Sequence, residues 1–211
     1  MKILKLTDPG VKHVINSHPA LRGKQRIGRG FYSVVFDNGD TVLKLTADAH
    51  HYDLLQFYAE GPHFPKVIVN HGYVGDQKAG EFPLYLLEIE KLVKVPGKTD
   101  NSKIVHKLCR TAARMMAAKT PIFERHADKI DMVRIVPETF YQMSEDKDLP
   151  TQLREGLEQL GRFALDYEGV GMDFHPSNFM QREATGELVL SDPIMNILTF
   201  NQALQAQHRS S

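Results

Sequence analysis

The stretch RIGRGFYSVVFDNGDTVLKLT, Arg26–Thr46, alternates short runs of β-prone residues with turn-forming residues. Val34–Phe36 form one such run and Thr41–Leu45 form the next. The Asn-Gly pair between these two runs is the strongest short-range signal for a β-hairpin. Gly28 and Gly30 lie in the turn of a preceding hairpin. The pattern therefore predicts three successive antiparallel strands.

The rest of the first half continues this β-rich pattern around one short helix. AHHYDLLQFYAE, Ala49–Glu60, places apolar and aromatic residues at helical spacing. FPKVIVNHGYV, Phe64–Val74, and FPLYLLEIEKLVKV, Phe82–Val95, are each predicted to be a strand. Turn-forming residues in VPGKTDNS then close this half. We expect a β-rich lobe over residues 1–90.

The second half, residues 91–211, is predicted to be mainly helical. Two segments, residues 102–119 and 151–167, each carry apolar residues on one helical face. These residues are Ile104, Leu108, Ala112 and Met115 in the first segment, and Leu153, Leu157, Leu160 and Ala164 in the second. ELVLSDP, Glu187–Pro193, is predicted to be a strand that leads into Asp192. The chain is therefore expected to have an α+β fold with two lobes.

The composition is that of an ordinary soluble globular protein, with 42% hydrophobic and 25% charged residues. The 26 basic and 26 acidic residues balance, which argues against nucleic acid or an anionic membrane surface as a partner. No apolar run reaches the length of a membrane span, and the charged N-terminus is unlike a signal peptide. Cys109 is the only cysteine, so no intrachain disulfide can form. We expect a cytoplasmic protein.

The segment GMDFHPSNFM, Gly171–Met180, is the strongest candidate for a functional site. Asp173, His175 and Asn178 interrupt a stretch with apolar residues on both sides. A turn needs only turn-forming residues and a core strand needs only apolar residues, so neither explains this combination. Asn178 follows Asp173 by five residues, and Asp192 follows after a predicted strand, turn and strand. Carboxylate and amide oxygens suit both proton transfer and binding of a hard cation.

These motifs together resemble those of the protein-kinase-like superfamily. The sequence from Gly28 to Ser33 resembles the GxGxxG loop of protein kinases, with Ser33 in place of the third glycine. A two-glycine hairpin turn is the more common explanation of this motif taken alone, but a kinase loop also joins two antiparallel strands, as predicted here. Lys44 in TVLKLT matches the strand-three lysine, and the interval from Asp173 to Asn178 matches the kinase catalytic loop.

Within this superfamily, the sequence of the predicted catalytic loop resembles that of particular groups of kinases. DFHPSN resembles the corresponding loops of aminoglycoside-type phosphotransferases and of phage-encoded serine/threonine kinases. GRGFYSVVF, DFHPSNFM and LVLSDP together favour the phage-encoded kinases. The resemblance implies a two-lobed protein-kinase-like fold, with a small antiparallel β-sheet N-lobe and a truncated, mainly helical C-lobe. It also implies ATP and Mg²⁺ as cofactors.

The resemblance assigns nucleotide-binding roles to the first half. Backbone N–H groups of Gly28, Gly30 and Ser33 would cover the phosphates, and Lys44 would neutralise charge on the α- and β-phosphates. The segment Leu87–Glu90, which contains Glu88 and Glu90, would be the hinge whose backbone pairs with the adenine edge.

The roles implied for the second half concern chemistry and metal binding. Asp173 would orient the acceptor hydroxyl and take its proton, while Asn178 and Asp192 would hold magnesium. His175 would either touch the transferring phosphate or brace the loop through hydrogen bonds, and we favour bracing.

The chain departs from the kinase pattern in three places. Gly171-Met172 stands before Asp173 where kinases have His-Arg, so control by a phosphorylated activation loop is not expected. No helix glutamate faces Lys44; Asp53 is our predicted partner, and His51 lies near the expected place. Nineteen residues follow Asp192, too few for the usual peptide-binding helices, so we expect a protein substrate to be recognised as a folded surface.

The predicted function is an ATP-dependent phosphotransferase, in the form of a minimal serine/threonine protein kinase. Two alternatives remain open. One is a small-molecule kinase of the aminoglycoside-phosphotransferase type, which the Asp-x-His-Pro loop permits. The other is a non-catalytic nucleotide-binding pseudokinase module, which the missing helix glutamate favours. Retention of Lys44, Asp173, Asn178 and Asp192 argues against this second alternative.

Overall fold

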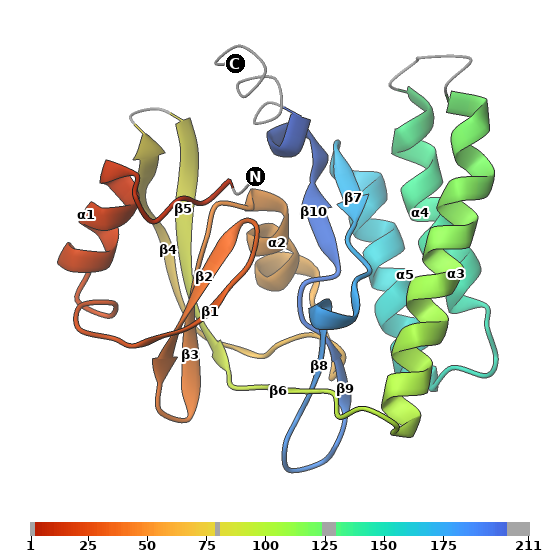
Figure 1. The fold of residues 1–211 in the computed structure, drawn as a ribbon. Helices are drawn as coiled ribbons and strands as arrows, with labels where there is room; N and C mark the ends of the chain where they lie inside the picture. Colours follow the sequence, from red (N-terminus) through yellow and green to blue (C-terminus); the bar gives the residue numbers. More distant parts are fainter. Residues whose placement is uncertain (1–2, 79–80, 124–129, 202–211) are drawn as a thin grey trace. The chain divides into compact units, whose positions relative to one another are not determined.

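A computed structural model describes residues 3–78, 81–123 and 130–201 (Figure 1). The chain divides into two compact units. The N-terminal unit contains the described residues up to Gln56, Lys66–Lys91 and those from Asn196 onward, and the helical unit contains Phe57–Pro65 and Leu92–Met195. The predicted α+β class is confirmed. The sequence predicts one boundary, after residue 90. In the structure, Phe57–Pro65 also belongs to the helical unit, and the chain from Asn196 onward belongs to the N-terminal unit.

The N-terminal unit is built on a five-stranded antiparallel sheet with the order β1-β2-β3-β5-β4. The strands are β1 (Arg26–Arg29), β2 (Ser33–Asn38), β3 (Thr41–Thr46), β4 (Val67–Lys78) and β5 (Glu81–Glu90). Side chains on one side of β2, β3 and β5 form a core, in which Val34, Leu45 and Leu86 have no exposed surface. The strands predicted from the sequence are confirmed.

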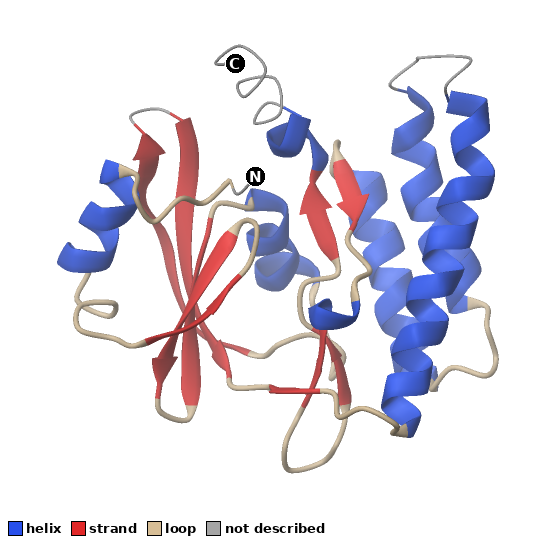
Figure 2. Ribbon diagram, in the orientation of Figure 1, coloured by secondary structure: helices blue, strands red, loops and turns tan. Residues whose placement is uncertain are grey.

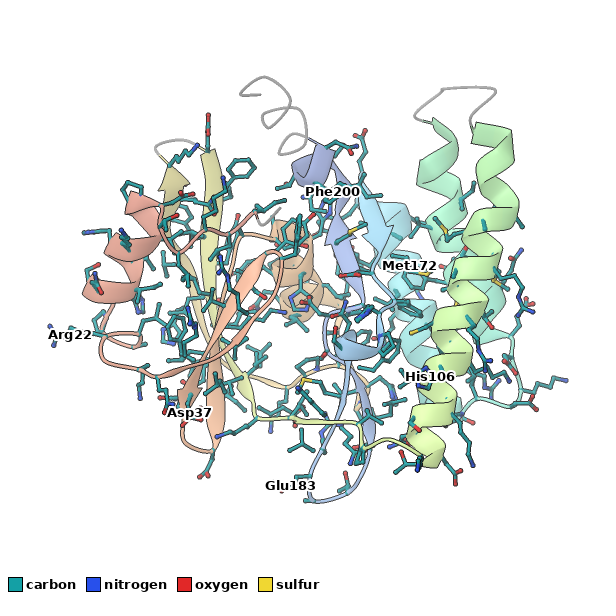
Figure 3. The ribbon with its side chains drawn as sticks, viewed as in Figure 1. Arg22, Asp37, His106, Met172, Glu183 and Phe200 are labelled. Atoms are coloured by element: carbon teal, nitrogen blue, oxygen red, sulfur yellow. The ribbon has the colours of Figure 1, made fainter. Side chains whose placement is uncertain are left out.

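The predicted Asn-Gly turn joins β2 to β3. Asn38 pairs with Thr41, so the loop consists of Gly39 and Asp40. Gly39 has a φ of 78°, which glycine adopts without steric cost, and this is the residue that a tight hairpin needs at its first loop position. Asp37 on β2, labelled in Figure 3, accepts a hydrogen bond from Lys91 just after β5.

Two helices belong to the N-terminal unit. α1 (Pro9–Ser17) lies beside β4, and α2 (Ala49–Asp53) contacts β5 (Figure 1). The sequence did not predict α1, because prolines and polar residues obscure its short apolar face of Val11 and Val14. The helix predicted over Ala49–Glu60 is confirmed, but its second half, Leu54–Tyr58, winds as a π-helix.

The helical unit places three long helices side by side (Figure 2). They are α3 (Asp100–Phe123), α4 (Ile130–Ser144) and α5 (Thr151–Asp166). The predicted apolar faces of α3 and α5 are confirmed by burial of Leu108, Ala112, Leu153, Leu157, Leu160 and Ala164. The sequence did not predict α4 as a separate helix, because Pro137 lies inside it and proline normally interrupts a helix.

Short strands complete the helical unit. β6 (Val93–Lys94), β8 (Phe179–Gln181) and β9 (Leu188–Leu190) form one antiparallel sheet, and β7 (Val170–Met172) pairs with β10 (Ile194–Asn196). A 3₁₀ turn, η2 (Pro176–Asn178), precedes β8. The single strand predicted over Phe82–Val95 is corrected, because the chain leaves the first sheet after Glu90 and β6 belongs to a different sheet. Within the described ranges, no helix has the length and apolarity needed to cross a membrane.

The approach of α1 to β4 generates a stability prediction. A Cβ atom at Gly10 would overlap the carbonyl oxygen of Asp76 and lie 2.7 Å from that of Gln77. Because these are backbone atoms of a paired strand, they cannot move aside easily. We expect Gly10→Ala to lower the free energy of unfolding by about 1–3 kcal/mol, the usual cost of overpacking. Denaturant titration measures this change.

Gly97→Ala is the matched control for this prediction. A Cβ atom at Gly97 meets nothing within 4 Å, and the residue has no positive φ. The control should stay within about 0.5 kcal/mol of the parent protein. Equal stability of the two variants would show that α1 does not pack on β4 through Gly10.

Candidate active site

The glycine-rich segment forms a closed turn between β1 and β2. The N–H of Gly30 donates to the carbonyl of Ser33 at 2.8 Å, and Gly28 pairs with Val35 across the hairpin. The carbonyl of Phe31 accepts from the N–H groups of Ile3 and Leu4 at 3.1 and 3.2 Å. The turn thus joins two antiparallel strands, which is the context expected of a kinase phosphate loop rather than of a dinucleotide-binding loop.

Lys44 is buried on β3, where it pairs with Val35 of β2 on one side and Leu87 of β5 on the other. Its side chain lies 3.3 Å from Nδ1 and 3.4 Å from Nε2 of His51. Lys44 is 5% exposed and His51 is fully buried. His51 of α2 therefore contacts Lys44, and the predicted pairing of Asp53 with Lys44 stays a prediction. Burial, and then the nearby charge of Asp53, raise the pKa of Tyr85.

Asp48 ties α2 to the segment that follows β10. One carboxylate oxygen of Asp48 accepts from the N–H of His51 at 3.1 Å and thereby caps the helix. The other oxygen accepts from the N–H of Asn196 at 3.2 Å. The carbonyl of Asn196 accepts from the hydroxyl of Tyr32 at 2.9 Å. A residue of the glycine-rich loop, the cap of α2 and a residue four positions after Asp192 are therefore joined within the N-terminal unit.

Asp173, in the helical unit, begins the predicted catalytic loop directly after β7. It follows Met172, which is labelled in Figure 3. The N–H of Asp173 donates to the carbonyl of Pro193 at 3.0 Å. The carbonyl of Asp173 accepts from the N–H of His175 at 3.0 Å and from the side-chain amide of Asn178 at 2.8 Å. These bonds fix the backbone at Asp173 on both sides.

Asn178 connects this loop to Asp192. Its backbone carbonyl accepts from the N–H groups of Ser191 and Asp192, at 2.9 and 3.2 Å, and from the hydroxyl of Ser191 at 2.9 Å. Because its Nδ2 donates to Asp173, its Oδ1 is the side-chain atom with lone pairs to offer a cation. The structure thus brings together Asp173, Asn178 and Asp192, the three residues of the helical unit that the sequence assigned to proton transfer and metal binding.

His175 caps the 3₁₀ turn that carries Asn178. Its Nδ1 accepts from the N–H of Ser177 at 3.3 Å and lies 2.7 Å from the hydroxyl of Ser177. The ring itself is exposed. This arrangement favours the bracing role for His175 over direct contact with the transferring phosphate.

Glu88 and Glu90 occupy structural positions in the sheet. The carboxylate of Glu88 accepts from the hydroxyl of Thr41 at 2.6 Å and the amide of Asn38 at 3.0 Å. The N–H of Glu90 donates to the carbonyl of Lys66 at 2.9 Å, and the Glu90 carboxylate accepts from the Lys66 N–H at 2.8 Å. Leu87–Glu90 pair with β3 and β4, and their predicted contact with the adenine edge stays a prediction.

Arg182 is a supporting residue that the sequence did not reveal. Its guanidinium donates to the carbonyls of Pro62 and Phe64 and to the carboxylate of Glu187. The carbonyl of His63 also accepts from the N–H of Leu190 at 2.6 Å. These bonds attach Phe57–Pro65 to the β8–β9 hairpin, whose two ends carry Asn178 and Asp192. A single arginine in a polar turn has no sequence signal that marks such a role.

Cys109 lies half-buried on α3. Burial raises the pKa of its thiol, because the charged thiolate is poorly solvated there. The nucleophilic thiolate is correspondingly scarce at neutral pH. Cys109 is therefore a packing residue rather than part of a catalytic site.

The chain matches no protein-family model and no curated protein. Among solved structures, it is similar to a thermostable mutant of aminoglycoside phosphotransferase APH(4)-Ia in ternary complex with AMP-PNP and hygromycin B. That match has a TM-score of 0.34 and 15% identity, over 92% of this chain and 71% of that chain. A complex of such a mutant with ADP and hygromycin B has a TM-score of 0.33 and 14% identity, over 92% and 74%. Similarity at this level does not establish a family.

The bonds of Arg182 generate a second stability prediction. Arg182→Met would leave two part-buried carbonyls and the Glu187 carboxylate without their charged donor. We expect the free energy of unfolding to fall by about 2–4 kcal/mol, since hydrogen bonds to charged groups contribute roughly 1.5–3 kcal/mol each. Thermal and denaturant unfolding measure the loss.

Arg162→Met is the matched control, because it makes the same chemical change on α5. The Arg162 side chain is 63% exposed and its contact with Glu158 spans one helical turn at 3.6 Å. The control should change stability by no more than about 0.5 kcal/mol. If Arg182→Met is as stable as this control, the anchoring role of Arg182 is wrong.

Proposed function

We propose that this protein is an ATP- and Mg²⁺-dependent phosphotransferase, and specifically a minimal serine/threonine protein kinase that transfers the γ-phosphate to a protein hydroxyl. The observation that carries the proposal is the hydrogen-bond network around Asn178. It links Asn178 to the backbone carbonyl of Asp173 and to the backbone N–H of Asp192. The segment thus gathers a carboxylate suited to proton transfer, Asp173, with an amide and a carboxylate suited to metal binding, Asn178 and Asp192. A purely structural loop has no need of this combination.

The helical unit supplies the groups for the acceptor and the metal. We assign the acceptor hydroxyl to Asp173, whose carboxylate would orient it and take its proton. Asn178 Oδ1 and the Asp192 carboxylate would hold Mg²⁺, which prefers oxygen ligands and is commonly bound by one or two protein groups together with substrate phosphates. When bound, magnesium neutralises charge on the phosphates. His175 keeps Asn178 in place through Ser177.

The N-terminal unit supplies the groups for the nucleotide. The turn from Gly28 to Ser33 would offer backbone N–H groups to the phosphates, and Lys44 would offer a positive charge. The backbone of Leu87–Glu90, at the end of β5, would pair with the adenine edge. We further propose a cytoplasmic location and a protein acceptor recognised through its folded surface.

Incubation with γ-labelled ATP and Mg²⁺ tests the proposed function. The parent protein is compared with Asp173→Asn, alone and with a cell lysate separated into protein and small-molecule fractions. Label on protein serine or threonine, lost in the variant, supports the proposal. Label only in the small-molecule fraction would assign the small-molecule kinase alternative. Absence of any label despite nucleotide binding would leave the pseudokinase alternative.

The separate roles of the two aspartates generate a prediction. Asp173→Asn should lower turnover by about 10²–10⁴-fold, the usual contribution of a general base, with nearly unchanged Mg²⁺-dependent ATP affinity. Asp192→Asn should lose turnover and also the magnesium dependence of ATP binding, because its carboxylate is a proposed ligand. Single-turnover rates and calorimetric titration with and without Mg²⁺ measure the two effects.

Both aspartate variants should melt near the parent temperature, since neither side chain belongs to the apolar core. Identical behaviour of the two variants, or full magnesium-dependent binding by Asp192→Asn, would contradict this assignment of roles.

A further inference from the structure

One face of α3 carries a line of basic side chains. They follow one another at intervals of four, three and four residues, so they project from the same side of the helix. These residues are Lys103, Lys107, Arg110 and Arg114. The buried residues Val105, Leu108 and Ala112 project from the opposite side, because their positions are about half a helical turn away. The basic line therefore faces solvent.

Part of this line borders a groove. Lys107, Arg110, Thr111 and Arg114 line an open groove with a volume of about 370 Å³. His106, labelled in Figure 3, lies on the same stretch of α3. All of these residues belong to the helical unit. Because three of the four lining side chains are cations, the groove suits an anionic ligand.

The two lysines of the line already bind carboxylates of this chain. Nζ of Lys103 lies 2.8 Å from the carboxylate of Asp100. Nζ of Lys107 lies 2.8 Å from the carboxylate of Asp146 and 3.1 Å from that of Asp148, in the connection between α4 and α5. The fold thus compensates the positive charge at this end of the line with acidic side chains.

The two arginines of the line bond to neutral oxygens of their own helix. Nε of Arg110 donates to the carbonyl of His106 at 3.2 Å, and the guanidinium of Arg114 donates to the hydroxyl of Thr111 at 3.4 Å. Within the part of the chain that the structure describes, no carboxylate forms an ion pair with either arginine. Each guanidinium has five N–H donors, so most of them remain for a ligand. Like charges one helical turn apart repel, and an external anion would relieve this repulsion.

We propose that Arg110 and Arg114 dock an acidic segment of a protein partner, with each guanidinium holding one carboxylate through paired hydrogen bonds. Two Asp or Glu side chains about one helical turn apart would match the spacing of the arginines. The partner is identified as the protein substrate, and this identification rests on the proposed function. Docking on α3 would then raise the affinity for the substrate.

The aspartates at the Lys107 end favour a short acidic segment over a nucleic acid. The side chain of Asp148 is 86% exposed, and Asp146 binds the same lysine. A long run of negative charge along α3 would be repelled there. Double-stranded DNA carries one charge per about 1.7 Å along its whole length, so it would extend past the arginines to these aspartates. A short segment can contact both arginines and end before them.

A fluorescently labelled peptide with glutamates spaced i, i+4 tests the groove directly, and the same peptide with glutamines is the ligand control. Fluorescence anisotropy measures its affinity for the full chain without nucleotide. Reversal of both charges, Arg110→Glu with Arg114→Glu, should weaken binding of the glutamate peptide at least about tenfold. Binding to the parent should also weaken as salt concentration rises, because the groove is exposed.

Arg22→Glu with Arg162→Glu is the matched control, since it changes the net charge by the same amount at two exposed arginines outside the groove. Arg22 is labelled in Figure 3, and Arg162 lies on α5. This control should keep the parent affinity. Arg110→Gln with Arg114→Gln removes the charges without placing acidic residues on α3, so it tests the groove even if the reversed pair folds poorly. Thermal melting checks the fold of every variant.

Three results would overturn docking of an acidic segment. They are equal affinity of the parent for the glutamate and glutamine peptides, equal loss in the groove variants and the matched control, and preference of the groove for duplex DNA over the glutamate peptide. None of these measurements requires phosphate transfer, so their failure is distinct from failure of the proposed function. If the peptide binds through Arg110 and Arg114 but the parent transfers no phosphate, the docking site is supported and its assignment to a substrate is overturned.

Discussion

The site in the helical unit depends on the backbone carbonyl of Asn178. This one oxygen accepts from Ser191 twice and from Asp192 once, and the side chain of the same residue donates to Asp173. A loop and a strand end separated by more than ten residues are thereby held in fixed relation. These bonds use backbone atoms of Asp173 and Asp192 together with the side chains of Asn178 and Ser191.

In the N-terminal unit, both carboxylate oxygens of Asp48 accept hydrogen bonds from backbone N–H groups. One oxygen fixes the start of α2 and therefore His51, and the other fixes Asn196. Lys44, the lysine proposed to bind phosphate, contacts His51 of the helix that this cap begins.

Much of the fold could be predicted because its signals are local. Alternation of β-prone and turn residues identified the strands from Arg26 to Thr46, and helical spacing identified the buried faces of α3 and α5. The interval between Asp173 and Asn178 also indicated a compact polar loop, which the structure closes with a cap and a side-chain hydrogen bond within a few residues. The roles assigned to this loop, to Gly30 and to Lys44 stay predictions.

By itself, the sequence determined the order of strands and helices and the polar residues offered at each turn, since periodicity and turn chemistry act between near neighbours. Only the tertiary structure decided which elements pair. It assigned Phe57–Pro65 to the helical unit through Arg182, paired Leu87–Glu90 with β3 and β4, and placed the His51 ring beside Lys44. These outcomes depend on contacts between residues distant in the chain, and their energies come from burial and hydrogen-bond partners that local patterns do not encode.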